Sequence, residues 1–246
     1  MEIQIAVAKI NQYNSPESGD TLETVERPGG GISVVLADSQ SSGKEAKQIS
    51  TMVVRKAISL LAEGVREDAS AQAASDYLYT EKKGLIAAFL NIMTVDFPTG
   101  TIILARNNPM PILIARRESV QVLHGSPEPI GSAPNIRPSI SEIPIEPGMT
   151  VLMFTDGLMN AGHANGMQMD VRTLLKSLLE EQDPTCQEIA DTILADALSL
   201  DNNQPVDDIS VVVLRVISKE RDLARRMTVH FPIPDFNQTS EISFSD

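Results

Sequence analysis

Residues Val151–Asn160, VLMFTDGLMN, contain an apolar run that ends abruptly at Thr155-Asp156-Gly157. An unbroken apolar run of this length, stopped by polar residues and glycine, predicts a buried strand followed by a tight turn. A carboxylate at the end of a buried strand is partly removed from water and needs a partner, because an unpaired buried charge is costly. A single aspartate here would most simply cap the next segment, but the same arrangement recurs along the chain.

Three further aspartates lie at predicted strand ends, each beside glycine, serine or another acid. They are Asp20, Asp38 and Asp207. Asp20 and Asp38 lie on two strands joined by the glycine-rich turn 28–31, so antiparallel pairing would bring them side by side. The sequence therefore predicts that several carboxylates meet at one end of a sheet.

Converging aspartates repel each other and raise one another's pKa values unless a cation lies among them. Hard divalent cations prefer oxygen ligands, so carboxylates in this pattern favour Mg²⁺ or Mn²⁺. The three histidines, His124, His163 and His230, are scattered and do not suggest a zinc site. Two ions about 3.5–4 Å apart would activate a water for in-line attack on phosphorus.

Composition excludes several other classes of function. The net charge of −13 argues against a nucleic-acid partner, and the single Cys186 indicates a reducing compartment. The first residues are too polar for a signal peptide, and no apolar run approaches the roughly 20 residues that span a bilayer. We therefore expect a cytoplasmic protein without a membrane partner, and the sequence leaves its oligomeric state open.

Hydrophobic periodicity predicts ten strands and four helices. The strands are expected at 2–10, 20–25, 32–37, 85–95, 101–105, 112–115, 120–123, 139–145, 151–154 and 209–216. Helices are expected around Ile49–Leu61, at 69–82 and 171–181, and after Asp183-Pro184-Thr185. The helices flank runs of strands instead of alternating with them, which favours an α+β fold of stacked antiparallel sheets between helices. Residues 126–137, rich in proline, are expected to form a loop or lid.

The C-terminal residues 217–246 differ in character from the rest of the chain. Basic residues cluster at Lys219, Arg221, Arg225 and Arg226, and Met227, Val229 and Phe231 alternate with polar residues. This pattern predicts an extension with one extra edge strand followed by a frayed tail. A basic cluster of this kind is more often a solvated face than a docking site for a phosphorylated partner.

Five short motifs occur in order along residues 1–216. They are SGD at 18–20, VLAD at 35–38 followed by SGK at 42–44, PIG at 129–131, EPG at 146–148 running into FTDGL at 154–158, and DDISVV at 207–212. In this combination the chain resembles the SpoIIE-type branch of the metal-dependent (type 2C, PPM) serine/threonine phosphatases, a branch that includes stressosome phosphatases. The loop after Asp38 departs from the pattern usual in that family.

The resemblance implies an αββα sandwich over residues 1–216 with two Mn²⁺ or Mg²⁺ ions at one end of the sheets. Asp38 would bridge both ions, Asp156 and Asp207 would complete the shell of one, and Asp20 would hold the site from the other side. Ser39 would lend its backbone carbonyl. The family hydrolyses phosphoserine and phosphothreonine with a metal-activated water. Typical substrates are small regulatory proteins, namely anti-sigma factor antagonists and stressosome components with STAS domains.

Two other functions stay open at this point. The same fold could serve as a catalytically weak binding module for a signalling partner, which the unusual loop after Asp38 favours. The chain could also hydrolyse a small phosphoester, although it has no glycine-rich loop for a nucleotide. The simplest alternative, that the aspartates only cap turns, is disfavoured by the number and order of the motifs.

Overall fold

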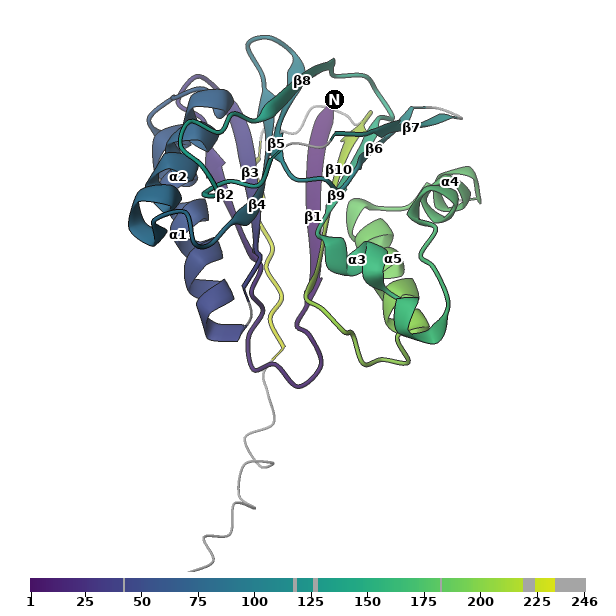
Figure 1. Ribbon diagram of the computed structural model, residues 1–246. Coiled ribbons are helices and arrows are strands. Elements are labelled where there is room, and N and C mark those ends of the chain that lie inside the picture. The colour runs from purple at the N-terminus through teal and green to yellow at the C-terminus, as the bar shows by residue number, and fades with distance from the viewer. Residues whose placement is uncertain (42, 117–118, 126–127, 182, 219–223, 233–246) are drawn as a thin grey trace, which may run out of the picture.

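Two five-stranded antiparallel sheets lie face to face in the computed structural model, with helices on both outer faces (Figure 1). The model describes residues 1–41, 43–116, 119–125, 128–181, 183–218 and 224–232. This arrangement confirms the predicted α+β sandwich of stacked antiparallel sheets flanked by helices.

The first sheet contains both the first and the last strand of the sandwich. Its order is β1 (Glu2–Ile10), β10 (Ile209–Ile217), β9 (Thr150–Phe154), β6 (Ile112–Arg116) and β7 (Ser119–Leu123). All of β9, and β10 up to its last residue, are buried because the sheet is covered on both faces. Strands covered on both faces need apolar residues throughout, which explains their unbroken hydrophobic sequences.

The second sheet contains two hairpins and two long connections. Its order is β2 (Thr21–Glu26), β3 (Gly31–Ser39), β4 (Ala88–Asp96), β5 (Thr101–Asn107) and β8 (Ser139–Pro144). The hairpins are β2–β3 and β4–β5, and the long connections run through the first two helices and through β6 and β7 of the first sheet. The predicted strand from residue 85 begins only at Ala88. Leu85 is 85% exposed and the preceding Gly84 has a positive φ of 72°, so the chain is still turning before that point.

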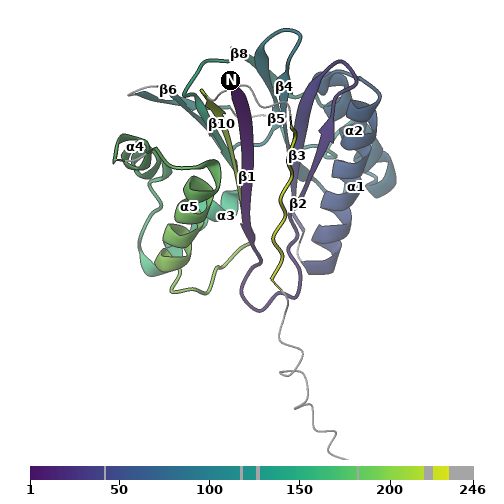
Figure 2. The same cartoon turned by 180° about the vertical axis from the view of Figure 1, so that it is seen from behind.

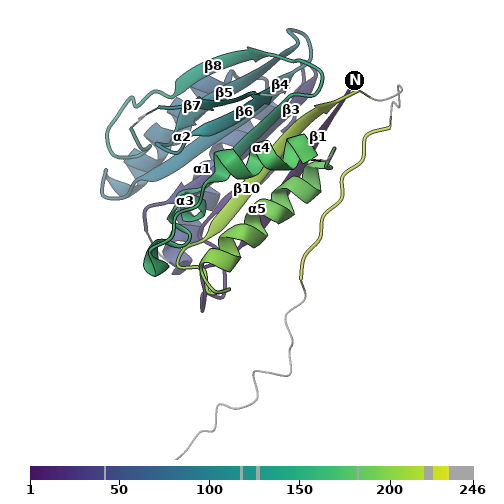
Figure 3. The same ribbon diagram turned by 90° about the vertical axis from the view of Figure 1, so that its right-hand side faces the viewer.

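The helices form one outer layer over each sheet (Figures 2 and 3). Helices α1 (Gly43–Ala62) and α2 (Glu67–Lys82) pack on the second sheet. Helices α3 (Asp156–Asn160), α4 (Val171–Glu181) and α5 (Cys186–Leu200) cover the first sheet. Helix α5 begins with a capping box in which Thr185 and Glu188 each satisfy the other's backbone N–H.

Three apolar layers hold the sandwich together. The middle layer lies between the sheets and includes Leu36, Leu104 and Val212, all almost fully buried. Separate clusters join each sheet to its own helices. With aromatic residues only 4% of the chain, these cores are built mainly from aliphatic side chains, as the composition requires.

The proline-rich segment predicted as a loop or lid is fastened to the fold within its described part, residues 128–137. Ile130 is buried and forms an isolated antiparallel bridge with Ala88. The backbone N–H of Gly131 donates to Ser75 Oγ on α2 at 3.1 Å. The loop prediction is therefore correct for residues 128–137. Ile130 and Gly131 attach this loop to β4 and α2.

Residues 224–232 are extended, exposed and paired with neither sheet. They run apart from the sheets in Figure 3, and Arg225 forms an ion pair with Glu26 at the end of β2. Met227, Val229 and Phe231, where the edge strand is expected, form no strand in this segment. Lys219, Arg221 and residues 233–246 lie outside the described residues, so the frayed tail and the boundary at residue 216 stay predictions. Among the described residues, no helix combines the length and apolar character needed to cross a bilayer.

The layer between the sheets gives a direct test of the packing. We expect Leu104→Ala to lower the free energy of unfolding by about 2–5 kcal/mol, because it removes buried methyl groups and leaves a cavity. Leu85→Ala, the same change at a position 85% exposed, should cost less than about 0.5 kcal/mol. Urea unfolding of both variants measures the difference. Equal losses of stability would contradict this account of the core.

Candidate metal centre

The hairpin of β2 and β3 brings Asp20 and Asp38 together. Thr21 pairs with Ala37 in its register, so the residues just outside that pair, Asp20 and Asp38, are neighbours across the two strands. Asp38 is the penultimate residue of β3, and Asp20 directly precedes β2. The hairpin predicted from the glycine-rich turn is present, and it places Asp20 beside Asp38 as expected.

The other two aspartates lie at the corresponding end of the first sheet. Phe154 of β9 pairs with Val211 of β10, so the end of one strand lies beside the start of the other. Asp156 is the first residue of α3, and Asp207 lies two residues before β10. Gly157 permits this approach, because a Cβ at that position would overlap the backbone carbonyl of the 207–208 segment.

Asp20 joins the two sheets through its buried carboxylate. Its Oδ2 accepts hydrogen bonds from Ser210 Oγ at 2.6 Å and from Thr155 Oγ1 at 3.1 Å. Both donors belong to the first sheet or its edge, whereas Asp20 begins the second. Only 1% of Asp20 is exposed, and its Oδ1 has no hydrogen-bond partner among the described residues. Oδ2 therefore accepts two hydrogen bonds, whereas Oδ1 accepts none from the described residues.

Asp38 interacts electrostatically with the other three aspartates. Burial, and then the charges of Asp20 and Asp156, raise the pKa of Asp38 far above its usual range. Burial also raises the pKa of Asp20 to about 6, against the opposing hydrogen bond from Ser210. Burial and the charge of Asp156 raise the pKa of Asp207 to about 6. Each shift reflects carboxylates that are short of solvent and compensating charge.

The donor set suits a hard divalent cation in its chemistry. It consists of carboxylate oxygens, and it includes the buried Oδ1 of Asp20 that lacks a partner. Among the described residues, however, no three His, Cys, Asp or Glu side chains are already disposed to hold an ion. Asp38 and Asp156 nevertheless already lie within hydrogen-bonding reach of each other.

Ser39, the predicted carbonyl ligand, is the last residue of β3 and is almost fully buried. Its hydroxyl is 2.7 Å from that of Ser41, which shapes the start of the following loop. In the ladder Ser39 lies opposite Ala88. Its position beside Asp38 is as expected, and its role as a metal ligand stays a prediction.

Three residues that the sequence analysis did not single out hold the site in place. Asp208 accepts hydrogen bonds from the backbone N–H groups of Gln12 at 2.8 Å and Gly19 at 2.6 Å. The ammonium groups of Lys9 and Lys47 both donate to the backbone carbonyl of Asp20, at 2.6 and 2.8 Å. Burial, and next the charge of Lys47, lower the pKa of Lys9 to about 8. The acidic pair at 207–208 was the one sequence signal that could have indicated Asp208.

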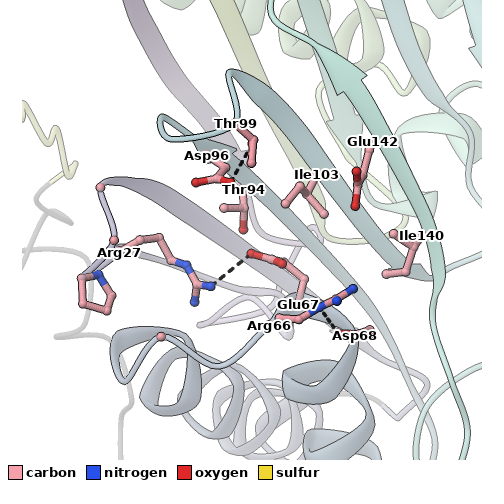
Figure 4. Close-up of a pocket in the computed structure, with 14 residues that line it drawn as sticks. Arg27, Arg66, Glu67, Asp68, Thr94, Asp96, Thr99, Ile103, Ile140 and Glu142 are labelled. Carbon is pink, nitrogen blue, oxygen red and sulfur yellow. Dashed lines mark hydrogen bonds and ion pairs between the residues drawn. The ribbon is translucent and has the colours of Figure 1, made fainter.

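A separate pocket of about 330 Å³ lies at the far end of the β2–β3 hairpin (Figure 4). Its wall contains an ion pair between Arg27 and Glu67 at 3.4 Å. Arg27 also donates to the carbonyls of Leu61 and Val65, so it fastens the hairpin to the α1–α2 turn. This pocket lies beside the β2–β3 turn, whereas the carboxylates lie at the opposite end of the same strands.

The sequence matches a protein family and is similar to one of its members. A family model described as "Stage II sporulation protein E (SpoIIE)" matches residues 28–217. The chain is also similar to the Stage II sporulation protein E of Bacillus subtilis (strain 168), with 22% identity over 200 residues. That match covers 81% of this chain and 24% of the relative, so the chain spans about a quarter of the relative's length.

Solved structures share the fold. The PP2C phosphatase domain of SpoIIE from Bacillus subtilis, solved with a fragment of its regulatory domain, matches with a TM-score of 0.76 and 20% identity over 88% of this chain and 64% of that one. The catalytic domain of the phosphatase PstP, in complex with two manganese ions, matches at 0.69 and 15% identity, covering 88% and 99%. RsbX in complex with magnesium matches at 0.64 and 14%, covering 86% and 94%.

The raised pKa values predict how the metal-free protein responds to pH. In EDTA we expect the free energy of unfolding to fall as the pH rises from about 4 through 6. The unfolded chain releases these protons near pH 4, whereas folded Asp20 and Asp207 keep them until about pH 6, so this stabilising difference is lost as the pH passes their folded pKa values. Urea unfolding at a series of pH values measures the slope.

Asp38→Asn should make this fall shallower, because the amide cannot ionise. Asp196→Asn, on the exposed face of α5, is the matched control and should keep the wild-type slope. Manganese added at neutral pH should restore stability to the wild type, since a ligand that binds only the folded state stabilises it. The raised pKa values would be ruled out as the cause if the free energy of unfolding of the wild type rose over this pH range in EDTA and Asp38→Asn followed the same curve.

Proposed function

The chain belongs to the Stage II sporulation protein E (SpoIIE) family, and we propose that it is a metal-dependent phosphatase of phosphoserine and phosphothreonine in proteins. The observation that carries this proposal is the gathering of four aspartates from both sheets. Burial without a compensating charge raises the pKa values of three of them, Asp20, Asp38 and Asp207. A divalent cation supplies that charge, and phosphate ester hydrolysis is the chemistry that such a centre supports.

Two Mn²⁺ or Mg²⁺ ions would be held mainly by Asp38, which faces Asp20, Asp156 and Asp207. In our assignment the carboxylates of Asp38, Asp156, Asp207 and Asp20 and the carbonyl of Ser39 would hold them. When bound, the ions would activate a water for in-line attack on phosphorus and neutralise the charge that develops there. The relatives PstP and RsbX, solved with manganese and magnesium, support this choice of metals.

The remaining residues of the centre position these ligands. Thr155 and Ser210 hold one oxygen of Asp20, which leaves the other free to face an ion. Lys9 and Lys47 fix the Asp20 backbone by its carbonyl, and Asp208 fixes the loop that leads to it. Each ligand therefore comes from a strand end whose backbone is held independently of the metal.

We further propose that the substrates are phosphorylated regulatory proteins, such as STAS-domain proteins or anti-sigma factor antagonists in stress signalling. The relatives include a stage II sporulation protein and RsbX, which supports this class. The single Cys186, buried and without a disulfide partner, supports action in the reducing cytoplasm.

One observation favours a second candidate, a phosphatase-fold module that binds a signalling partner with little turnover. Among the described residues, no three acidic, histidine or cysteine side chains are already disposed to hold an ion. A weak affinity for the metals would follow if the carboxylates must move to bind them. This candidate predicts partner binding that persists when EDTA removes the metal.

Hydrolysis of p-nitrophenyl phosphate and of a phosphoserine peptide tests the proposal. We expect turnover to require Mn²⁺ or Mg²⁺. Asp38→Asn and Asp156→Asn should each lower the turnover rate by about 100-fold or more, because each removes a charged ligand. Asp191→Asn, exposed on α5, should leave the rate unchanged. Activity that survives both site substitutions and excess EDTA would overturn the proposal, and no turnover with metal bound would favour the binding module.

A further inference from the structure

A second groove lies on the outer side of α1, next to the loop that carries Asp20. Its volume is about 370 Å³, and Glu17 of that loop forms one wall. The other described residues that line it all belong to α1: Lys44, Lys47, Gln48, Thr51, Met52 and Arg55. The groove therefore extends from the first turn of the helix to beyond its middle.

The groove is basic on a strongly acidic protein. The chain carries 33 acidic and 20 basic residues, yet the groove presents three cations and only one acid among the described residues that line it. The nearest ion pair, between Arg55 and Glu23 of β2, has its atoms 3.9 Å apart, and the Arg55 side chain is 75% exposed. A pair of this kind contributes little, so Arg55 stays available for another anion.

Two contacts join the helix that lines the groove to the backbone around Asp20. Lys47 lines the groove and donates to the Asp20 carbonyl at 2.8 Å and to Thr21 Oγ1 at 3.0 Å. Ser50 on the same helix donates to the carbonyl of Gly19. Helix α1 is thus fixed against residues 19–21, and the groove lies beside the loop that leads to Asp20.

We infer that this groove binds an acidic segment that flanks the phosphorylated residue of the substrate protein. The inference rests on the proposed function for the substrate's phosphate and adds the class of sequence beside it. Basic side chains along one helix attract an extended acidic segment and steer it toward the centre, and the overall negative charge of the enzyme would otherwise repel such a substrate.

The length of the groove sets the length of the segment. Lys44 and Arg55 are eleven residues apart on α1, which corresponds to roughly 16 Å at 1.5 Å per residue. An extended peptide covers about 3.3 Å per residue, so about five flanking residues would fill the groove. Met52 offers an apolar contact midway along the helix.

The experiment compares phosphoserine peptides of equal length with five acidic or five basic flanking residues, each on the N-terminal or the C-terminal side. We expect wild-type kcat/KM to favour an acidic flank on one of the two sides. Arg55→Glu should lower this preference by about three- to five-fold and Gln48→Lys should raise it about two-fold, mainly through KM. The preference should also weaken as salt concentration rises.

Arg172→Glu, on exposed α4 over the other sheet, is the matched control and should keep the wild-type preference. All three variants should hydrolyse p-nitrophenyl phosphate as the wild type does, because this ester has no flanking residues. A wild-type preference for basic flanks, or an Arg55→Glu variant that behaves like Arg172→Glu, would overturn the inference.

Binding measured without turnover separates this inference from the proposed function. Fluorescence anisotropy of an unphosphorylated acidic peptide in EDTA should rank the affinities as Gln48→Lys, wild type, then Arg55→Glu. If no variant hydrolyses any ester but this order holds, the phosphatase proposal fails and the groove stands. If hydrolysis is normal but the three proteins bind the peptide equally, the groove assignment fails alone.

Discussion

The carboxylate of Asp20 connects the two sheets of the sandwich at the end where the four aspartates lie. Apolar packing holds the sheets together along most of their length, but it cannot fix the relative position of individual polar atoms, because it is not directional. The hydrogen bonds from Thr155 and Ser210 to Asp20 supply that direction. The relative position of carboxylates from opposite sheets therefore depends on short polar bridges, and the contacts of Lys9 and Asp208 near Asp20 add to these two hydrogen bonds.

This arrangement sets stability against function at one end of the molecule. Burial of Asp20, Asp38 and Asp207 raises all three pKa values, which shows that their charged forms are disfavoured in the fold. The frame tolerates them because three apolar clusters, one between the sheets and one between each sheet and its helices, are almost completely buried. Electrostatic cost at functional sites is commonly offset by packing elsewhere.

The sequence predicted the parts of the site that local patterns determine. The glycine-rich turn fixes the hairpin, and the hairpin fixes Asp20 beside Asp38. The roles of Asp208, Lys9 and Lys47 could not be predicted, because each depends on the path of a loop relative to strands distant in sequence. Asp208, for example, contacts Gly19 across 189 positions. The start of β4 was missed for a simpler reason: the apolar Leu85 extends the pattern although its side chain lies in solvent.

The contacts of Asp208 restrict how the loop between β1 and β2 can change during evolution. Both of its oxygens bind main-chain N–H groups, those of Gln12 and Gly19, and a main-chain donor is present whatever the side chain. Residues between these two points can vary in identity, except that proline cannot replace a donor and a side chain at Gly19 would collide with Ala46. An insertion or deletion would displace one of the two donors, so we expect relatives with this geometry to preserve the length of the loop more strictly than its composition.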